Sequence, residues 1–165
     1  MLSSVVKKIL IVEDNENIST LYRIKFEKEW YVVRVCGDGM DAITHVMDFT
    51  PDAILLDIMM PSMNGFEALR VIRQLVPSLR TKIVMFSNLN SQNDIDRCIQ
   101  AGADWYMLKA DTTPAAAVQK IEELFAYSQM KGRTDLLQVE THTKTNIMYC
   151  KCPSCWEEFE QTLPM

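Results

Sequence analysis

Short apolar runs alternate with longer amphipathic segments from residue 7 to residue 127. The apolar runs are rich in β-branched and aliphatic residues, as buried strands are, whereas the segments between them repeat apolar residues every three or four positions, as helices do. We predict strands within residues 7–12, 31–36, 53–57, 82–87 and 105–109. The predicted helices follow these strands, and their apolar stripes are Ile18, Leu21, Tyr22 and Phe26; Ala42, Ile43, Val46 and Met47; Phe66, Leu69, Ile72 and Val76; Ile95, Cys98 and Ile99; and Val118, Ile121, Leu124 and Phe125.

Helix boundaries are marked by residues that favour helix ends. Ser91 or Asn93 can cap the fourth helix, and Pro114 lies in the first turn of the fifth, where its missing N–H costs nothing. Five strands alternating with five helices predict an α/β fold, a doubly wound five-stranded parallel sheet with helices on both faces and right-handed crossovers. We assign residues 1–129 to this domain and residues 130–165 to a small C-terminal extension.

Polar side chains stand where the predicted strands end. Glu13 and Asp14 follow the first strand, Asp57 the third, Ser87 the fourth and Lys109 the fifth. Because ligands of such sheets bind at the carboxyl ends of the strands, we expect these five side chains to share one crevice. Two carboxylates about 4 Å apart repel each other by roughly 4 kcal/mol at a surface-like dielectric, so the crevice needs counter-charges. Lys109 supplies one, and Mg²⁺, which prefers oxygen ligands, supplies another.

This grouping predicts a phosphoryl site. Asp57 would be the nucleophile that forms an aspartyl phosphate, while Mg²⁺ and Lys109 neutralise the oxygens of the transferred group. Ser87 would donate a hydrogen bond to a phosphoryl oxygen.

Composition narrows the function further. The net charge of -5 gives no broad attraction to nucleic acid or to an anionic membrane, so direct DNA binding is disfavoured. No apolar run approaches the roughly 20 residues of a membrane-spanning helix, and the first ten residues lack the features of a signal peptide, which predicts a cytoplasmic protein. The odd count of five cysteines argues against a secreted disulfide scaffold, and we expect Cys36 and Cys98 to be small core residues.

The chain from about Lys7 to Tyr127 resembles a response-regulator receiver domain of two-component signalling, similar to the chemotaxis response regulator. The residues that carry this resemblance are Glu13-Asp14, Asp57 with Met60-Pro61 and Gly65, Ser87, Ala101-Gly102-Ala103, and Lys109. It implies a flavodoxin-like sheet in the order 2-1-3-4-5. It also implies that Asp57 accepts a phosphoryl group from a histidine kinase or a phosphotransfer protein.

The resemblance further implies roles for neighbouring residues. Mg²⁺ would be held by Glu13, Asp14, Asp57 and the backbone carbonyl of Met59, and Ser87 and Tyr106 would move on phosphorylation. The downstream protein target would bind the face formed by the fourth helix, fifth strand and fifth helix. A second copy of the chain, in a homodimer, is a separate candidate partner. We expect a phosphorylation-dependent switch with no DNA-binding output domain and no enzymatic activity beyond slow loss of its own phosphoryl group.

Three features depart from the family pattern. Ala110 replaces the proline that usually follows the lysine, so the Lys109–Ala110 peptide is either cis, at about 3 kcal/mol, or the loop is re-routed. Asn88 replaces a small residue after Ser87 and could crowd the incoming phosphate. Met59 and Leu89 are apolar where family members often carry groups that position attacking water, so we expect slow autodephosphorylation.

Other interpretations stay open at this point. A degenerate receiver could keep the fold without the chemistry and serve as a phosphorylation-independent protein-binding module, with the cysteine-rich tail as its contact. Tyr106 could be a packed aromatic residue instead of a switch. An aspartyl phosphatase of the haloacid dehalogenase type is excluded, because Met59 occupies the position of its second aspartate.

The extension is polar and threonine-rich before a cluster of cysteines. Cys152 and Cys155 have the spacing of a zinc knuckle, and Cys150 could add a third ligand. The fourth ligand of a tetrahedral Zn²⁺ site could be His142 or a thiolate from another subunit. A reduced tail without metal, a small hairpin and a redox role are the alternatives.

Overall fold

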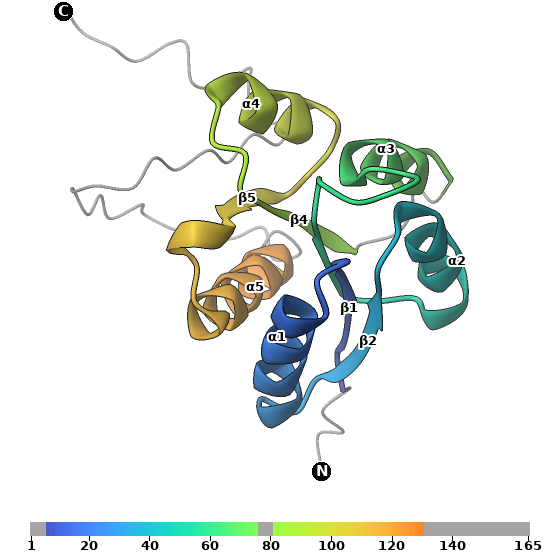
Figure 1. Ribbon diagram of the computed structural model, residues 1–165. Helices are drawn as coiled ribbons and strands as arrows, with labels where there is room; N and C mark the ends of the chain where they lie inside the picture. Colours follow the sequence, from blue (N-terminus) through green and yellow to red (C-terminus); the bar gives the residue numbers. More distant parts are fainter. Residues whose placement is uncertain (1–5, 76–80, 131–165) are drawn as a thin grey trace, which may run out of the picture.

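A parallel sheet of five strands, in the order β2-β1-β3-β4-β5, runs through the middle of the fold (Figure 1). The computed structural model describes residues 6–75 and 81–130. The strands are β1 (Lys8–Val12), β2 (Val32–Cys36), β3 (Ala53–Leu56), β4 (Lys82–Ser87) and β5 (Trp105–Leu108). The helices are α1 (Glu16–Lys28), α2 (Gly39–Phe49), α3 (Gly65–Leu75), α4 (Gln92–Gln100) and α5 (Pro114–Met130), with a short 3-10 turn η1 (Lys109–Asp111). The predicted doubly wound sheet and its strand order are confirmed.

Alternate residues of each strand divide the core into two layers. Leu10, Ile54 and Ile83 face α2, α3 and α4, whereas their neighbours Ile9 and Val84 face α1 and α5. Figure 1 shows these two groups of helices on opposite sides of the sheet. Because both faces of the sheet are covered, the central strands are apolar on both sides, and the sequence signal of unbroken apolar runs follows from that burial.

Two helix stripes differ from the prediction. Leu21 of α1 is 56% exposed and Met47 of α2 is 59% exposed, although both were predicted to face the core. The buried side of α1 is made by Tyr22 and Phe26, four residues apart. Leu21 is rotated from Tyr22 by about 100° around the helix axis, as one residue is in any α-helix, and therefore points to solvent. Met47 follows the buried Val46 and turns outward for the same reason.

The helix ends agree with the predicted caps. The Ser91 side chain accepts a hydrogen bond from the Asp94 N–H at the start of α4, and α5 begins at Pro114. Strand β5 ends at Leu108, one residue before the prediction, so that Lys109 opens η1. The Lys109–Ala110 peptide is trans, like every other peptide bond among the described residues, and the loop therefore takes the re-routed alternative.

The C-terminal extension from residue 131 onward lies outside the described residues, so the domain boundary and the proposed zinc ligands Cys150, Cys152, Cys155 and His142 stay predictions. No helix within the described ranges is long and apolar enough to cross a lipid bilayer.

Candidate functional site

The acidic residues of the site meet because β1 and β3 are neighbours in register. Val12 pairs with Leu56, and the next residues, Glu13 and Asp57, leave the two strands side by side. The Asp57 N–H donates to the Val12 carbonyl at 2.9 Å, which extends the ladder to the phosphoacceptor candidate. One carboxylate oxygen from each of Glu13, Asp14 and Asp57 lies within 4.8 Å of the others. The sequence prediction that these three residues converge is therefore met in the geometry.

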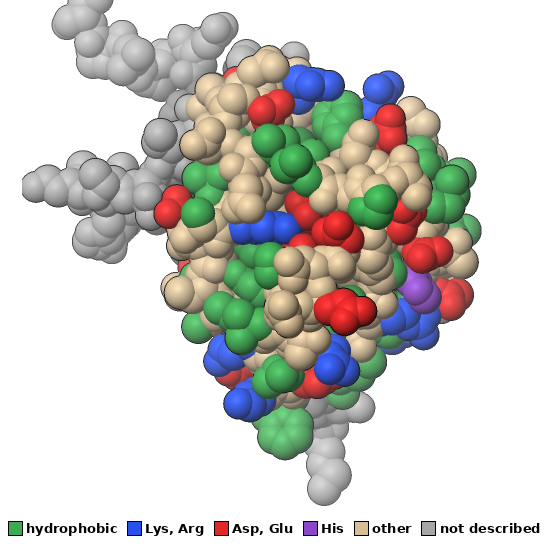
Figure 2. Space-filling view, in the orientation of Figure 1, with side chains coloured by type: hydrophobic (Ala, Val, Ile, Leu, Met, Phe, Trp, Pro, Cys, Tyr) green, Lys and Arg blue, Asp and Glu red, His purple; other side chains and the backbone are tan. Residues whose placement is uncertain are grey.

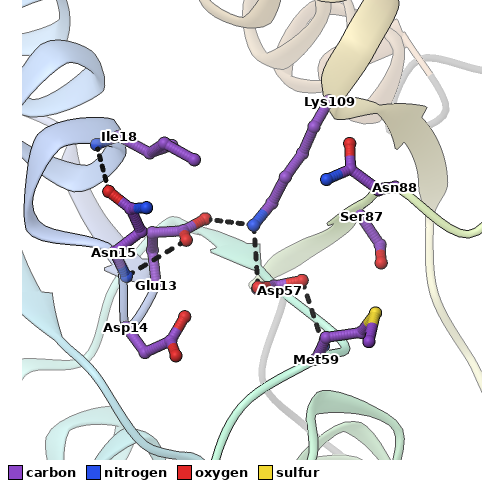
Figure 3. Close-up of a pocket in the computed structure, with 9 residues that line it drawn as sticks. All are labelled: Glu13, Asp14, Asn15, Ile18, Asp57, Met59, Ser87, Asn88 and Lys109. Atoms are coloured by element: carbon purple, nitrogen blue, oxygen red, sulfur yellow. Dashed lines mark hydrogen bonds and ion pairs between the residues drawn. The ribbon is translucent and has the colours of Figure 1, made fainter.

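Lys109 reaches into this acidic cluster from the end of β5. Its Nζ lies 2.7 Å from Asp57 Oδ2 and 2.6 Å from Glu13 Oε2, and the side chain is 10% exposed (Figure 3). The contact with Asp57 is a hydrogen bond, whereas the contact with Glu13 is an ion pair only. Among the described residues Glu13 Oε2 has no hydrogen-bond partner although it is buried. In the space-filling view, acidic and basic side chains meet near the centre of the visible face (Figure 2).

Burial and charge act in opposite directions on this cluster. Burial raises the pKa of Glu13 above its ordinary value, and the nearby Lys109 only partly opposes this effect. Burial alone would lower the pKa of Lys109, but its contacts with Asp57 and Glu13 outweigh burial and raise that pKa. The lysine is therefore held as a cation, while three carboxylates share its single positive charge. The cluster has an excess of negative charge, which a cation can neutralise.

The donor set fits Mg²⁺. The three carboxylates are hard oxygen ligands, Asp14 is exposed to solvent, and Glu13 and Asp57 are each 3% exposed. A cation here would meet Glu13 Oε2, which pairs with the Lys109 ammonium, and would still have access to water, since Asp14 is exposed; Mg²⁺ keeps several water ligands in most protein sites.

The pocket is lined by residues at or just after the carboxyl ends of β1, β3, β4 and β5. The pocket has a volume of about 210 Å³, and Figure 3 shows the nine residues that line it: Glu13, Asp14, Asn15, Ile18, Asp57, Met59, Ser87, Asn88 and Lys109. Ser87, at the end of β4, is fully buried, and the Met59 N–H donates to Asp57 Oδ1 at 3.1 Å. Asn88 stands beside Ser87, as predicted from its place after the strand. A pocket of this size admits a phosphoryl group and a hydrated cation.

Asn15 and Ile18 line the pocket but were not predicted as site residues from the sequence. The Asn15 side chain caps α1 by accepting hydrogen bonds from the N–H groups of Asn17 and Ile18, and the backbone N–H of Asn15 donates to Glu13 Oε1 at 3.3 Å. The signal that could have identified it is an N-cap asparagine directly after the acidic pair. Ile18 reaches the pocket because it lies in the first turn of that helix.

Tyr106 does not line the pocket but contacts the loop after Ser87. Its hydroxyl donates to the Leu89 carbonyl at 2.8 Å, and the Leu89 N–H donates to Ser87 Oγ at 3.4 Å. Burial raises the pKa of Tyr106 to about 12, with a smaller opposing effect from Ser87. Leu89 is therefore bonded on one side to a pocket residue and on the other to Tyr106.

Fold and site together define an α/β protein with a cluster of three carboxylates and a lysine at the carboxyl edge of its sheet. The family model described as the response regulator receiver domain matches residues 9–122. The chain therefore belongs to the response-regulator receiver family, whose members are signalling phosphoacceptors that bind Mg²⁺ in an acidic pocket of this kind.

The chain matches only part of the length of its curated relatives. The chain is 34% identical over 103 residues to the DNA-binding response regulator MtrA of Mycobacterium tuberculosis, which is 62% of this chain and 44% of the relative. It is 36% identical over 103 residues to the alkaline phosphatase synthesis transcriptional regulatory protein PhoP of Bacillus subtilis, again 62% of this chain and 42% of the relative. The match thus spans less than half of these relatives.

Solved structures agree with the fold. A CheY-like receiver domain protein from Methanospirillum hungatei is 27% identical and superimposes with a TM-score of 0.71, covering 78% of this chain and all (100%) of that one. A BeF3-activated DrrB receiver domain is 23% identical with a TM-score of 0.66, covering 74% of this chain and 99% of that one, and shows the fold alone.

Proposed function

We propose that the protein is a phosphorylation-dependent signalling switch whose phosphoacceptor is Asp57. The observation that carries this proposal is the position of Lys109, whose ammonium lies 2.7 Å from Asp57 and 2.6 Å from Glu13 across the acidic cluster. A lysine held at this point can bind an oxygen of a phosphoryl group attached to Asp57, because its ammonium would exchange the Asp57 carboxylate oxygen for an anionic phosphoryl oxygen.

The transfer can be written from these residues. A carboxylate oxygen of Asp57 attacks the phosphorus of a phosphohistidine on a histidine kinase or phosphotransfer protein. The P–O bond forms as the P–N bond breaks, and the leaving imidazole nitrogen keeps the electron pair of that bond and takes up a proton from water. Glu13, Asp14, Asp57 and the Met59 carbonyl would hold Mg²⁺, which supplies charge neutralisation for the phosphoryl oxygens. Lys109 adds a second positive charge, and the Ser87 hydroxyl donates a hydrogen bond to the bound group.

Leu89 supports a route from the phosphoryl group to the surface. Ser87 Oγ now accepts from the Leu89 N–H, and Tyr106 donates to the Leu89 carbonyl. When the Ser87 side chain turns to a phosphoryl oxygen, the bond with Leu89 is lost and the loop that holds Tyr106 is released to shift. The two states then differ in the face formed by α4, β5 and α5, where we place the downstream protein target or a second copy of the chain. The net charge of -5 gives the chain no broad electrostatic attraction to nucleic acid.

The proposal is tested by incubating the protein with Mg²⁺ and acetyl phosphate and measuring the intact mass. The expected result is the gain of one phosphoryl unit that is lost in Asp57→Asn and kept in Asp52→Asn, a half-buried aspartate that instead binds the backbone at Lys8. If the parent protein gains no mass with acetyl phosphate or with a phosphorylated histidine donor, the phosphorylation-independent binding module is favoured. Asn88, which lines the pocket, is the feature that supports this alternative, because it would crowd an incoming phosphate.

We further propose that the aspartyl phosphate is long-lived. Met59 lines the pocket and is 61% exposed, so the mouth of the site offers an apolar side chain where attacking water would need a polar partner. A lifetime of many minutes to hours is expected by analogy with the family, and Met59→Asn should shorten it. A lifetime of seconds in the parent protein would contradict this part of the proposal.

A further inference from the structure

The loop between β3 and α3 directly follows the phosphoacceptor candidate Asp57 and is closed on itself by a backbone hydrogen bond. The Gly65 N–H donates to the Ile58 carbonyl at 3.0 Å, so the two ends of the loop are bonded to each other. A Cβ atom at Gly65 would lie 1.8 Å from the Asp57 carbonyl oxygen, a distance that no side chain can occupy. Between these ends the loop carries Met59, which bonds to Asp57 and contributes the carbonyl proposed as a metal ligand.

The outer side of this loop is pressed against the start of α2 at Gly39. The Gly39 N–H donates to the Met63 carbonyl at 3.3 Å. A Cβ atom at Gly39 would lie 2.6 Å from that same carbonyl oxygen, 2.9 Å from Met63 Cγ and 3.1 Å from the Cβ of Ala68 in α3. The first of these neighbours is backbone, so an alanine at position 39 must push the loop itself and cannot be accommodated by a change of rotamer. Gly39 thus permits an approach of α2 to the loop that any larger residue prevents.

We propose that Gly39 is a positioning residue for the metal site, because it sets where the β3–α3 loop holds the Met59 carbonyl relative to the three carboxylates. This inference rests on the proposed function, and it assigns to α2 a role in binding Mg²⁺ without contact with the ion. The physical reason is the tolerance of the metal. Mg²⁺ requires oxygen ligands near 2.0–2.1 Å in octahedral geometry, so a shift of a few tenths of an ångström in one ligand weakens binding. Because the hydrogen bond between Ile58 and Gly65 closes the loop, a displacement of the backbone at Met63 also displaces the backbone at Met59.

Gly37 provides a matched control on the same turn. It lies two residues before Gly39, between β2 and α2, and a Cβ atom there would lie 3.5 Å from Asp14 Cα and 3.8 Å from the Glu13 carbonyl oxygen. These distances are ordinary van der Waals contacts, and the φ angle of Gly37 is not in the left-handed region. Gly37→Ala therefore makes the same chemical change beside the acidic pair without displacing the loop.

The experiment measures Mg²⁺ binding to the full, unphosphorylated chain by titration calorimetry with magnesium chloride, together with thermal unfolding in the absence of metal. We expect the Kd for Mg²⁺ to rise about tenfold in Gly39→Ala, the loss typical of removing an outer support of a metal ligand, and to stay unchanged in Gly37→Ala. A Gly39→Ala variant that is less stable but binds Mg²⁺ like the parent overturns the positioning role and leaves Gly39 a packing residue. A parent protein that binds no Mg²⁺ contradicts the proposed function itself.

A second variant tests the same loop without crowding α2. Ser62, in the middle of the loop, has a φ of 61°, in the left-handed region that glycine adopts freely. Ser62→Gly is therefore sterically harmless but loosens the loop, and we expect weaker Mg²⁺ binding at a nearly unchanged melting temperature. If Gly39→Ala does not fold, this variant decides the question, and unchanged Mg²⁺ affinity in Ser62→Gly overturns the claim that the placement of the loop sets the affinity.

Discussion

Replacing Lys109 with glutamine tests the electrostatic account of the site. Glutamine is close to lysine in length and carries no charge, so the change removes the cation that lies 2.7 Å from Asp57 and 2.6 Å from Glu13. The lysine side chain is 10% exposed, and those of Asp57 and Glu13 are 3% and 2% exposed. The variant therefore leaves two buried carboxylates without their shared counter-charge.

The expected magnitude follows from that burial. Breaking a buried ion pair by removing one partner costs about 3–5 kcal/mol, because the remaining charge stays out of water. The repulsion that Lys109 now offsets has the same order: carboxylate oxygens within 4.8 Å of each other interact by at least about 3 kcal/mol at an effective dielectric of 20. We expect the free energy of unfolding at pH 7 without metal to fall by about 3–5 kcal/mol, and the melting temperature by roughly 10–15 °C.

The assay is urea unfolding of the parent and Lys109→Gln, each with a chelator and with millimolar Mg²⁺. Mg²⁺ should stabilise the variant more than the parent, because the divalent cation then neutralises a site with one more unbalanced negative charge. Lys25→Gln is the control: Lys25 pairs with Glu29 at 2.5 Å on the surface of α1, and its loss should cost less than about 1 kcal/mol with or without metal.

Two results would refute the reasoning. Equal stability of parent and Lys109→Gln in the chelator would mean that the lysine does not balance the buried carboxylates. A destabilised variant that Mg²⁺ fails to rescue would mean that the lost interaction is another one, such as the cation–π contact of the lysine ammonium with the Phe86 ring, and not the balance of the carboxylate charges.

Stability should also depend on pH through Glu13, on the Tyr106–Leu89 hydrogen bond and on the hydrogen bonds of Arg73. The pKa of Glu13 is raised above its ordinary value of 4.5, so its contribution to stability is fully present below pH 4.5 and is lost as the pH rises through the higher folded-state pKa. The gain in melting temperature that Mg²⁺ produces should therefore grow as the pH rises above 4.5. A gain that does not change with pH would contradict this sign. Tyr106→Phe removes the hydrogen bond to the Leu89 carbonyl and should lower the unfolding free energy by about 0.5–1.5 kcal/mol in urea titrations. An unchanged unfolding free energy would show that this hydrogen bond does not contribute to stability. Arg73→Ala should cost about 2–3 kcal/mol by the same assay, because its guanidinium donates to the Gly102 and Thr81 carbonyls and to Asp104, whereas Ala at the exposed Arg70 of the same helix should cost little.

The sequence by itself determined the elements of the fold and the chemistry at the ends of the strands. Apolar runs that end at Asp14, Asp57 and Lys109 predict both a buried strand and the polar side chain at its carboxyl end. The spacing of apolar residues between these runs predicts which side of each helix is buried. The parallel arrangement then brings all these ends to one edge of the sheet, so the members of the site could be named before their distances were known.

Only the tertiary structure decided how these residues contact one another. The register of β1 against β3, the trans peptide after Lys109 and the cap formed by Asn15 set the atoms that meet, and none of them leaves a periodic signal in the chain. The outward turn of Leu21 and the approach of Gly39 to Met63 depend on how a helix is rotated and on what stands opposite it. Local sequence encodes which residues prefer burial, but contacts between distant segments depend on packing, which is a property of the whole fold.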